Sequence, residues 1–224
     1  MLIPIKDDNP TTTFPFITIL LIAANAAVFF YQMSLGKYVE VFIFKAALIP
    51  HEFTLSLKPS LFYGLPLIKK FIASMFLHGG FVHISGNMLF LWIFGNNVED
   101  TLGHMRFLLF YLLCGIIASS VHIFMNPSST VPIIGASGAI AGVLGAYFLL
   151  FPRARVWVLF FFIIFIRLIP VPAVIVLGMW FILQILSAPA GGDVAWYAHI
   201  GGFITGMTLI MAFQRSKRKY RRFL

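Results

Sequence analysis

Apolar residues form long stretches in this chain of 224 residues. A helix needs about 20 apolar residues to cross the roughly 30 Å hydrocarbon core of a bilayer. Two stretches reach that length, and four shorter ones are bounded by polar or helix-breaking residues. The pattern predicts an all-α fold with six transmembrane helices, at Phe14–Ser34, Ile84–Phe94, Met105–Met125, Ser137–Phe151, Pro172–Ala188 and Tyr197–Phe213.

A seventh apolar stretch, Val156–Ile169, is harder to assign. It lies between Pro152 and Pro170 and contains Arg167. As a crossing helix it would bury this arginine and put the two termini on opposite sides of the membrane. We expect an interfacial or re-entrant segment on the cytoplasmic side, with Arg167 reaching the lipid headgroups. A seventh span is the alternative.

The first connection is long. About forty residues, Leu35–Leu77, separate the first two predicted helices, and three prolines interrupt them. Aromatic and aliphatic residues alternate there with polar ones, which is typical of a surface that dips into a leaflet. We expect a short cytoplasmic tail at 1–13, a membrane domain at 14–214 with this embedded first loop, and a basic cytoplasmic tail at 215–224.

The composition also indicates an integral membrane protein. Hydrophobic residues make up 60% of the chain and charged residues only 10%, where a soluble domain carries roughly 25%. The net charge of +9 could suggest nucleic acid as a partner. However, six of the sixteen basic residues lie in the tail that directly follows an apolar stretch, which favours anionic lipid headgroups. Membrane lipid is therefore the expected partner, and nucleic acid is not.

The basic residues also predict the orientation. With six spans, eleven lysines and arginines fall on one side of the membrane and five on the other, all five in the first loop. By the positive-inside rule the side with eleven is cytoplasmic. We therefore expect a multi-pass protein of a prokaryotic plasma membrane with both termini in the cytoplasm.

Polar side chains recur at one depth in three predicted helices. Counted from the cytoplasmic helix ends at about 1.5 Å per residue, Ser137, His199 and His83 lie roughly 6–10 Å below the outer surface. Asn87 lies one turn deeper, on the face of His83. Polar groups are costly in a membrane, and convergent ones usually line a functional cavity. Since neutral imidazole can take a proton from a hydroxyl, Ser137 is the candidate nucleophile and His199 the candidate base.

The residues around Ser137 suit the stabilisation of an oxyanion. A helix that begins there directs free backbone N–H groups toward the place where negative charge would develop. His83 and Asn87 could donate further hydrogen bonds. Gly135 and Gly138 would allow a tight turn and keep side chains away from a substrate carbonyl.

Small residues would bring the two candidate groups together. The sixth predicted helix carries Gly202 and Gly206 in a GxxxG pattern, which by itself usually indicates only helix packing. The fourth predicted helix has a matching small face, made of Gly138, Ala141, Gly142, Gly145 and Ala146. Small faces allow close approach of helix axes, so His199 is expected within hydrogen-bonding reach of Ser137.

The sequence resembles the rhomboid intramembrane serine proteases at three places. Their second span is similar to His78–Asn87 together with Leu91–Gly95 and Glu99. Their serine motif is similar to Gly135–Gly145, and their histidine motif is similar to Ala198–Gly206.

The resemblance implies a six-span fold and a Ser137–His199 dyad without an acidic third member. It also implies an oxyanion hole of His83, Asn87 and the Ser137 backbone, with the first loop and the fifth span beside lateral substrate access. His78 is expected either to steady the loop or to lie where water reaches the site. The expected activity is cleavage of transmembrane-helix protein substrates near their outer ends.

The chain departs from the family pattern at two positions. Many members have a Trp-Arg pair in the first loop, where this chain has Lys69-Lys70, so the loop is expected to be anchored differently. Some place an aromatic four residues after the serine, stacked on the catalytic histidine. Because Ala141 stands there, we expect neighbouring aromatics to hold His199 instead.

Other functions fit the sequence less well. We expect no metal and no other cofactor: the His-Glu-x-x-His pattern fails at Leu55, and the pair His78 and His83 has no carboxylate partner. A transporter is disfavoured because the spans show no inverted repeat. A catalytically silent relative that binds transmembrane clients is the main alternative, and retention of all four polar residues argues against it. The oligomeric state stays open.

Overall fold

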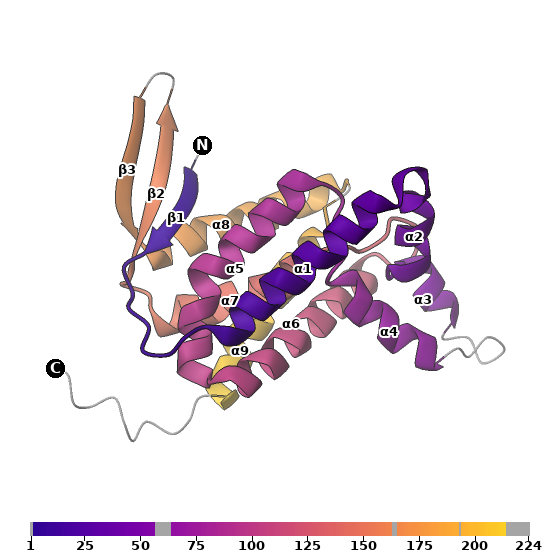
Figure 1. The fold of residues 1–224 in the computed structure, drawn as a ribbon, viewed down its shortest axis with the longest axis horizontal. Coiled ribbons are helices and arrows are strands. Elements are labelled where there is room, and N and C mark those ends of the chain that lie inside the picture. Colours follow the sequence, from indigo (N-terminus) through magenta and orange to yellow (C-terminus); the bar gives the residue numbers. More distant parts are fainter. Residues whose placement is uncertain (1, 57–63, 163–164, 193, 214–224) are drawn as a thin grey trace.

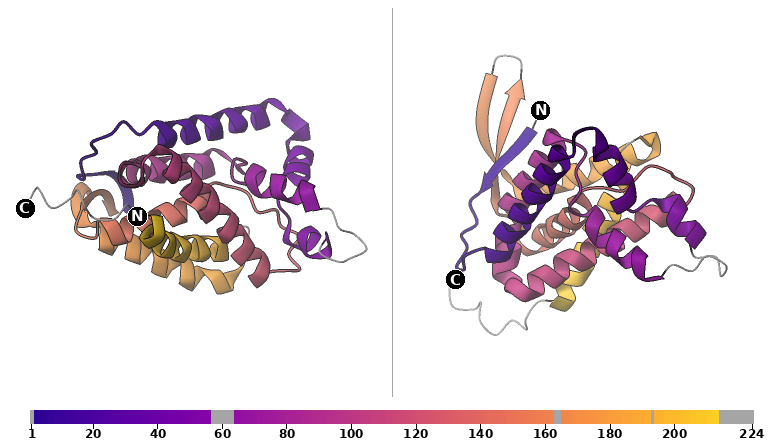
Figure 2. Two further views of the ribbon diagram at one scale, coloured as in Figure 1. Left: turned by 90° about the horizontal axis from the view of Figure 1, so that it is seen from below. Right: turned by 45° about the vertical axis from the view of Figure 1, so that its right-hand side comes forward.

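Six long helices lie side by side in the described part of the chain and alternate in direction between two ends of the molecule (Figures 1 and 2). The computed structural model describes residues 2–56, 64–162, 165–192 and 194–213. The predicted basic tail at 215–224 lies outside these residues. The six helices are α1 (Phe16–Ser34), α5 (Phe81–Leu102), α6 (His104–Met125), α7 (Ser137–Leu150), α8 (Ala173–Ser187) and α9 (Trp196–Phe213).

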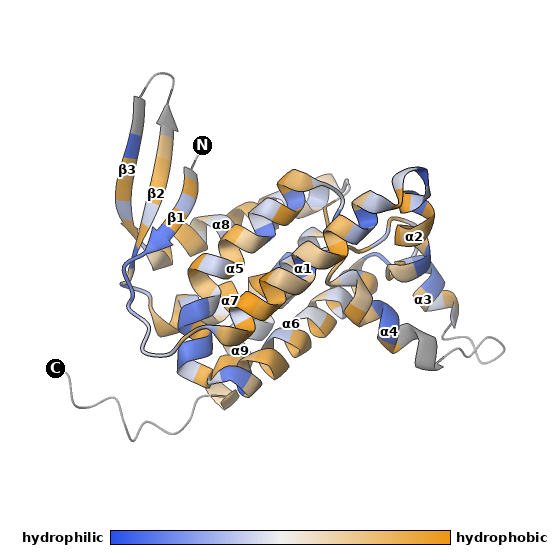
Figure 3. Ribbon diagram, viewed as in Figure 1, coloured by the Kyte–Doolittle hydropathy of each residue, from blue (hydrophilic) through white to orange (hydrophobic). Residues whose placement is uncertain are grey.

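The molecule is mostly helical, and four of its described helices are long and apolar enough to cross a membrane. These are α1, α6, α9, and α8 together with the short 3₁₀ helix η3 (Ala188–Ala190). α7 is equally apolar but has only 14 residues. Large apolar side chains remain exposed on the outer faces, and apolar residues run along all the long helices in Figure 3. Such faces are suited to contact with lipid chains.

α5 extends well beyond the predicted stretch Ile84–Phe94, at both ends. Its last turns carry polar groups that form hydrogen bonds with the N-terminal segment. The buried Glu99 carboxylate accepts the backbone N–H groups of Ile17 and Thr18, at 2.8 and 2.7 Å, and so caps the start of α1. A hydropathy pattern cannot show this partner, which is why the predicted helix ended too early.

The first loop is largely helical. It contains the 3₁₀ helix η1 (Gly36–Tyr38), α2 (Val39–Ala46), α3 (Pro50–Ser56) and α4 (Gly64–Ser74). Lys70 on α4 forms an ion pair with Glu52 on α3, at 3.0 Å. An isolated β-bridge joins Leu48 to Ile133, in the segment just before α7. The lysine pair thus contributes to loop anchoring, through Lys70, and the loop is tied to the approach to Ser137.

The prediction of an all-α fold was wrong, because a three-stranded antiparallel sheet projects from one end of the helices (Figure 1). Its strands are β1 (Leu2–Asp7), β2 (Arg155–Phe162) and β3 (Phe165–Pro172), in the order β1-β2-β3. Val158 pairs with both Pro4 and Ile169. The stretch Val156–Ile169 is therefore a β-hairpin, and the alternative of a seventh spanning helix was wrong.

The residues of this hairpin explain its conformation. β-branched and aromatic side chains favour strands over helices. Val156 and Val158 are buried, whereas Arg155 is exposed and Trp157 is half-buried, so the alternation suits a sheet with one covered face. β1 comes from the other end of the chain, and local sequence gave no sign of this partner.

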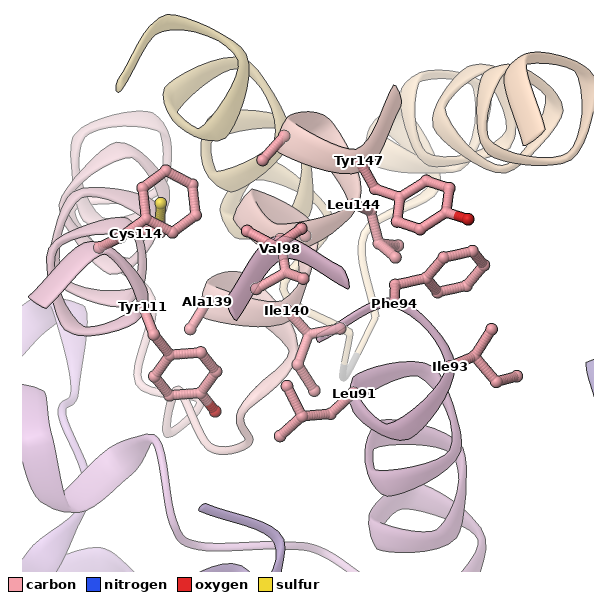
Figure 4. Close-up of a cluster of buried hydrophobic side chains, with 14 of the residues drawn as sticks. Leu91, Ile93, Phe94, Val98, Tyr111, Cys114, Ala139, Ile140, Leu144 and Tyr147 are labelled. Atoms are coloured by element: carbon pink, nitrogen blue, oxygen red, sulfur yellow. The ribbon is translucent and has the colours of Figure 1, made fainter. Parts of the chain in front are cut away.

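α7 lies at the centre of the helices, and nine of its fourteen residues are buried. Figure 4 shows side chains from α5, α6 and α7 that gather around it, among them Phe94, Ile140 and Leu144. At its far end, Tyr147 packs edge-on against Phe94, and its hydroxyl donates to Asp7 on β1, at 2.5 Å. The core therefore surrounds α7, with Ser137 at its first turn.

Candidate functional site

Ser137 is the first residue of α7, and a turn at Gly135 directly precedes it. Gly135 has a φ of +115°, a conformation that favours glycine, and its N–H donates to the carbonyl of Ser74 at 2.9 Å. A Cβ atom at Gly135 would lie only 2.7 Å from His83 Nε2. The turn thus needs glycine for its conformation and for its close approach to α5.

The close approach of α7 and α9 that the glycines predicted is found. A Cβ atom added at Gly202 would collide with the carbonyl oxygen of Gly138, and one at Gly206 would collide with that of Gly142. Gly138 itself packs against Ala118 on α6. The two helix backbones are therefore in direct contact, as small interfacial residues permit.

This contact brings together the two groups proposed for catalysis. His199 lies in the first turn of α9, and its Nε2 is 2.8 Å from Ser137 Oγ. Sixty-two positions separate the residues in sequence. A hydroxyl and an imidazole at this distance can exchange a proton directly.

His199 is held on its other side by residues of α8 and by one aromatic of α9. The Gln184 side-chain oxygen lies 2.8 Å from His199 Nδ1. The Trp180 ring lies tilted at 5.9 Å from the imidazole, and the Trp196 ring meets it edge-on at 6.1 Å. Neighbouring aromatics thus surround the histidine, as expected from Ala141, but Gln184 was missed. Its signal was that it is the one amide in the predicted fifth span.

His83 and Asn87 project from the first turns of α5 toward the Gly135 turn. The Gly79 N–H lies 3.4 Å from His83 Nδ1 and donates to it, which leaves the proton on Nε2, facing Gly135. Asn87 Nδ2 would lie 3.5 Å from a Cβ atom at Gly135. Both groups thus present N–H donors to the backbone two residues before Ser137.

His78 contacts Asn87 through a hydrogen bond. It is buried, and its Nε2 lies 3.0 Å from Asn87 Nδ2, while its Nδ1 lies 3.3 Å from the carbonyl of Phe76. Gln32 at the end of α1 bonds both the N–H and the carbonyl of His78, each at 3.1 Å. These contacts join His78 to α1, to α5 and to the end of the first loop.

One small cavity lies beside Ser137, and a larger one adjoins it. A cavity of about 10 Å³ touches Ser137 and is lined by small residues, among them Gly115, Ser119 and Ala198. This volume corresponds to about one water molecule. A larger one, of about 270 Å³, lies next to it, between the end of α6 and the start of α9, and its lining includes His122 and Tyr197. The two share Ile133 and Ala195 in their walls.

A serine paired with a histidine at the N-terminal starts of two apolar helices defines a candidate intramembrane hydrolase site. In a comparison with known proteins, residues 68–216 match the family model of the Rhomboid domain. The chain belongs to the rhomboid family.

Three relatives illustrate the similarity. Rhomboid protein 1, mitochondrial, of Saccharomyces cerevisiae is 34% identical over 147 residues, which are 61% of this chain and 39% of the relative. Rhomboid protease GluP of Bacillus subtilis is 43% identical over 77 residues, 34% of this chain and 15% of GluP. Presenilin-associated rhomboid-like protein, mitochondrial, of Homo sapiens is 33% identical over 97 residues, 42% and 25% of the two chains.

The matched segments thus span less than half of these relatives' own lengths. The relatives also come from different compartments, since two of the three are named as mitochondrial and the third is bacterial. They support an integral membrane protein, together with the apolar helices. They do not single out a prokaryotic plasma membrane.

Proposed function

We propose that this protein is an intramembrane serine endopeptidase that hydrolyses peptide bonds in or near transmembrane segments of other proteins. The observation that carries the proposal is the 2.8 Å separation between His199 Nε2 and Ser137 Oγ within an apolar helical protein. Membership of a family that includes a named protease supports it.

In the proposed reaction, Ser137 Oγ attacks the substrate carbonyl carbon while His199 Nε2 takes the hydroxyl proton. The C–N bond then breaks, and the imidazolium gives this proton to the leaving amine. A water molecule attacks the resulting ester, with His199 again as the base, and the carboxylic acid product leaves Ser137 free. The small cavity beside Ser137 has room for that water.

The negative charge on the carbonyl oxygen needs hydrogen-bond donors. We propose that the backbone N–H of Ser137, His83 Nε2–H and the amide of Asn87 supply them. The N–H of a first helical residue has no acceptor within its helix, so it is free for this task. The positions of His83 and Asn87 around Gly135 support the assignment. Donors fixed before the reaction lower the barrier because they need no reorganisation.

We further propose that all six long helices cross the bilayer, with both termini in the cytoplasm. The alternating helix directions and the positive-inside distribution support this topology. The chain start, the end of α7, the start of α8 and the sheet then lie together at the cytoplasmic surface. Ser137 lies toward the opposite surface, so a transmembrane-helix substrate would be cut near its outer end.

The test is cleavage of a labelled single-span substrate by the protein in liposomes, without added metal. The Ser137→Ala variant is expected to lose cleavage, and His199→Ala to lose about 10²- to 10⁴-fold in rate, the usual contribution of a general base. Ser120→Ala is the matched control, because Ser120 lies exposed on α6 and only bonds the carbonyl of Ile116. Mass spectrometry of the products locates the cut.

Labelling of Ser137 by a serine-reactive phosphonate gives a second readout, independent of substrate choice. A folded protein that neither cuts nor reacts with the phosphonate would contradict the proposal. That outcome would favour a catalytically silent, client-binding protein.

A further inference from the structure

Gln184 occupies an unusual position for an amide. It lies in α8, whose other long side chains are mostly exposed and apolar, yet it is itself buried. In α8 only Ala173, Leu177 and Gln184 are buried among the residues described. Its side chain therefore points inward at the level of His199, in a helix that otherwise contributes few groups to the protein interior.

The hydrogen bonds of Gln184 define which end of the amide faces the histidine. Its Nε2 donates to the backbone carbonyl of Trp180 at 3.1 Å, and a carbonyl can only accept. The amide oxygen is therefore the atom at 2.8 Å from His199 Nδ1. Because this oxygen also only accepts, Nδ1 must carry the proton.

That proton decides what the other ring nitrogen can do. A neutral imidazole has one N–H, so Nε2 then has a free lone pair. This lone pair faces Ser137 Oγ at 2.8 Å, which is the arrangement needed to take the hydroxyl proton. With the opposite tautomer, Nε2 would already hold a proton and could not act as the base.

We propose that Gln184 is a positioning residue for His199: its amide oxygen holds the imidazole in the Nδ1–H tautomer and aims Nε2 at Ser137. The inference rests on the proposed function, since it concerns the base of the same reaction. Gln184 would serve as a neutral third member beside the serine and the histidine. It orients the ring and steadies the imidazolium that forms, without a formal charge of its own.

A purely structural role would look different. A polar bond between two membrane helices also contributes to helix association, so loss of Gln184 is expected to lower stability in either case. Only a positioning role requires that the His199 tautomer and the reactivity of Ser137 change with the acceptor at position 184. The experiment therefore measures both, and stability separately.

The tautomer is read from the ¹⁵N NMR spectrum of the full chain labelled at histidine, with the His199 signals assigned through the His199→Ala variant. The unmodified protein is expected to show Nδ1–H. Gln184→Met keeps the length of the side chain but removes the acceptor, and is expected to mix the tautomers. Gln184→Glu restores an acceptor and is expected to restore Nδ1–H.

The rate of phosphonate labelling at Ser137 is measured on the same samples. Gln184→Met is expected to slow labelling about 10- to 100-fold, the usual effect of removing the partner that orients a histidine, and Gln184→Glu to recover most of the loss. Leu177→Ala is the matched control, because it removes a buried α8 side chain. It is expected to lower the unfolding midpoint without changing the tautomer.

The outcomes separate the two proposals. If Gln184→Met folds and His199 keeps a pure Nδ1–H tautomer, the positioning role is overturned, whether or not the protein is a protease. If the tautomer depends on Gln184 but the unmodified protein neither cuts nor reacts with the phosphonate, the proposed protease function fails and the positioning of His199 stands.

Discussion

Several residues in this protein form hydrogen bonds with partners that are distant in the sequence. Asp7 is such a residue: its carboxylate accepts the hydroxyl of Tyr147, at the end of α7 opposite Ser137. Burial raises the pKa of Asp7 above its ordinary value of 3.8, although the bond from Tyr147 acts in the other direction. The contact therefore links the N-terminal strand to the central helix in a way that depends on pH.

The sign of this dependence follows from the raised pKa. At pH values between 3.8 and that raised pKa, folded Asp7 holds a proton that the unfolded chain has released, so its contribution to stability is greatest below 3.8. The contribution is lost as the pH rises through the pKa of the folded state. Asp7→Asn keeps an acceptor for Tyr147 but cannot titrate. We expect its unfolding midpoint to change less with pH than that of the unmodified protein, over this window.

The measurement is thermal unfolding in detergent at a series of pH values from about 3.8 upward, with both proteins side by side. At neutral pH the variant is expected to be at least as stable as the unmodified protein. Parallel curves for the two proteins would contradict the raised pKa of Asp7.

At the scale of helices, the distance between α7 and α9 decides whether Ser137 can meet His199. Gly206 lies against the backbone of Gly142, with no room for a side chain. An added methyl group must push the two helices apart, and overpacking of this kind costs about 1–3 kcal/mol. Because His199 lies two turns from Gly206 on α9, the displacement also separates the reacting atoms.

We therefore expect Gly206→Ala to lose stability and most of the phosphonate labelling at Ser137. Gly86→Ala is the matched control, since Gly86 lies in the exposed part of α5 and a Cβ atom there meets nothing within 4 Å. Replacing this glycine in a helix is expected to stabilise by about 0.5–1 kcal/mol. Denaturant unfolding and labelling rates check both variants, and equal stability of the two would show that the α7–α9 contact is not tight.

Only one feature of the three-stranded sheet could be recognised from the sequence. Its hairpin and its third strand come from residues 155–172 and 2–7. The apolar character of the hairpin was visible in the sequence. Strand pairing with the chain start was not, because it depends on two segments about 150 residues apart.

For the whole molecule, the central prediction is the topology. The single cysteine, Cys114, is buried, so it leaves a clean background for labelling with a membrane-impermeant maleimide. New cysteines at exposed positions report each end of the molecule: Pro10→Cys and Arg153→Cys at one, Lys37→Cys and Ser128→Cys at the other. We expect the first two to react from the cytoplasmic side and the last two from the opposite side.

Maleimide labelling of each cysteine variant is measured in sealed vesicles of both orientations. Labelling in vesicles opened with detergent shows that every cysteine can react. Reaction of Pro10→Cys and Arg153→Cys from opposite sides would contradict the six-span arrangement. It would mean that one of the four helices between these two positions does not cross, and the first candidates are α5 and α7, which are not among the four long apolar helices.

Much of the candidate site could be predicted because its chemistry is local. Ser137, His199, His83 and Asn87 stand out as polar groups in apolar stretches, and the glycines beside them indicate close helix contact. Gln184 carried the same kind of signal but had no obvious partner in sequence. Its contact with His199 requires that α8 and α9 pack together with Gln184 and His199 at the same level.

Hydrophobic pattern and composition thus indicated the membrane setting and most of the long helices, and the polar residues within the apolar stretches pointed to the Ser137–His199 pair. A segment that crosses the lipid must be long and apolar, and such a segment can be recognised from the local sequence alone. Only the tertiary structure decided the length of α5, the three-stranded sheet, the hydrogen bonds of His78 and the contact between Gln184 and His199. Each of these depends on hydrogen bonds between distant segments, and such partners are chosen by three-dimensional packing rather than by the local sequence.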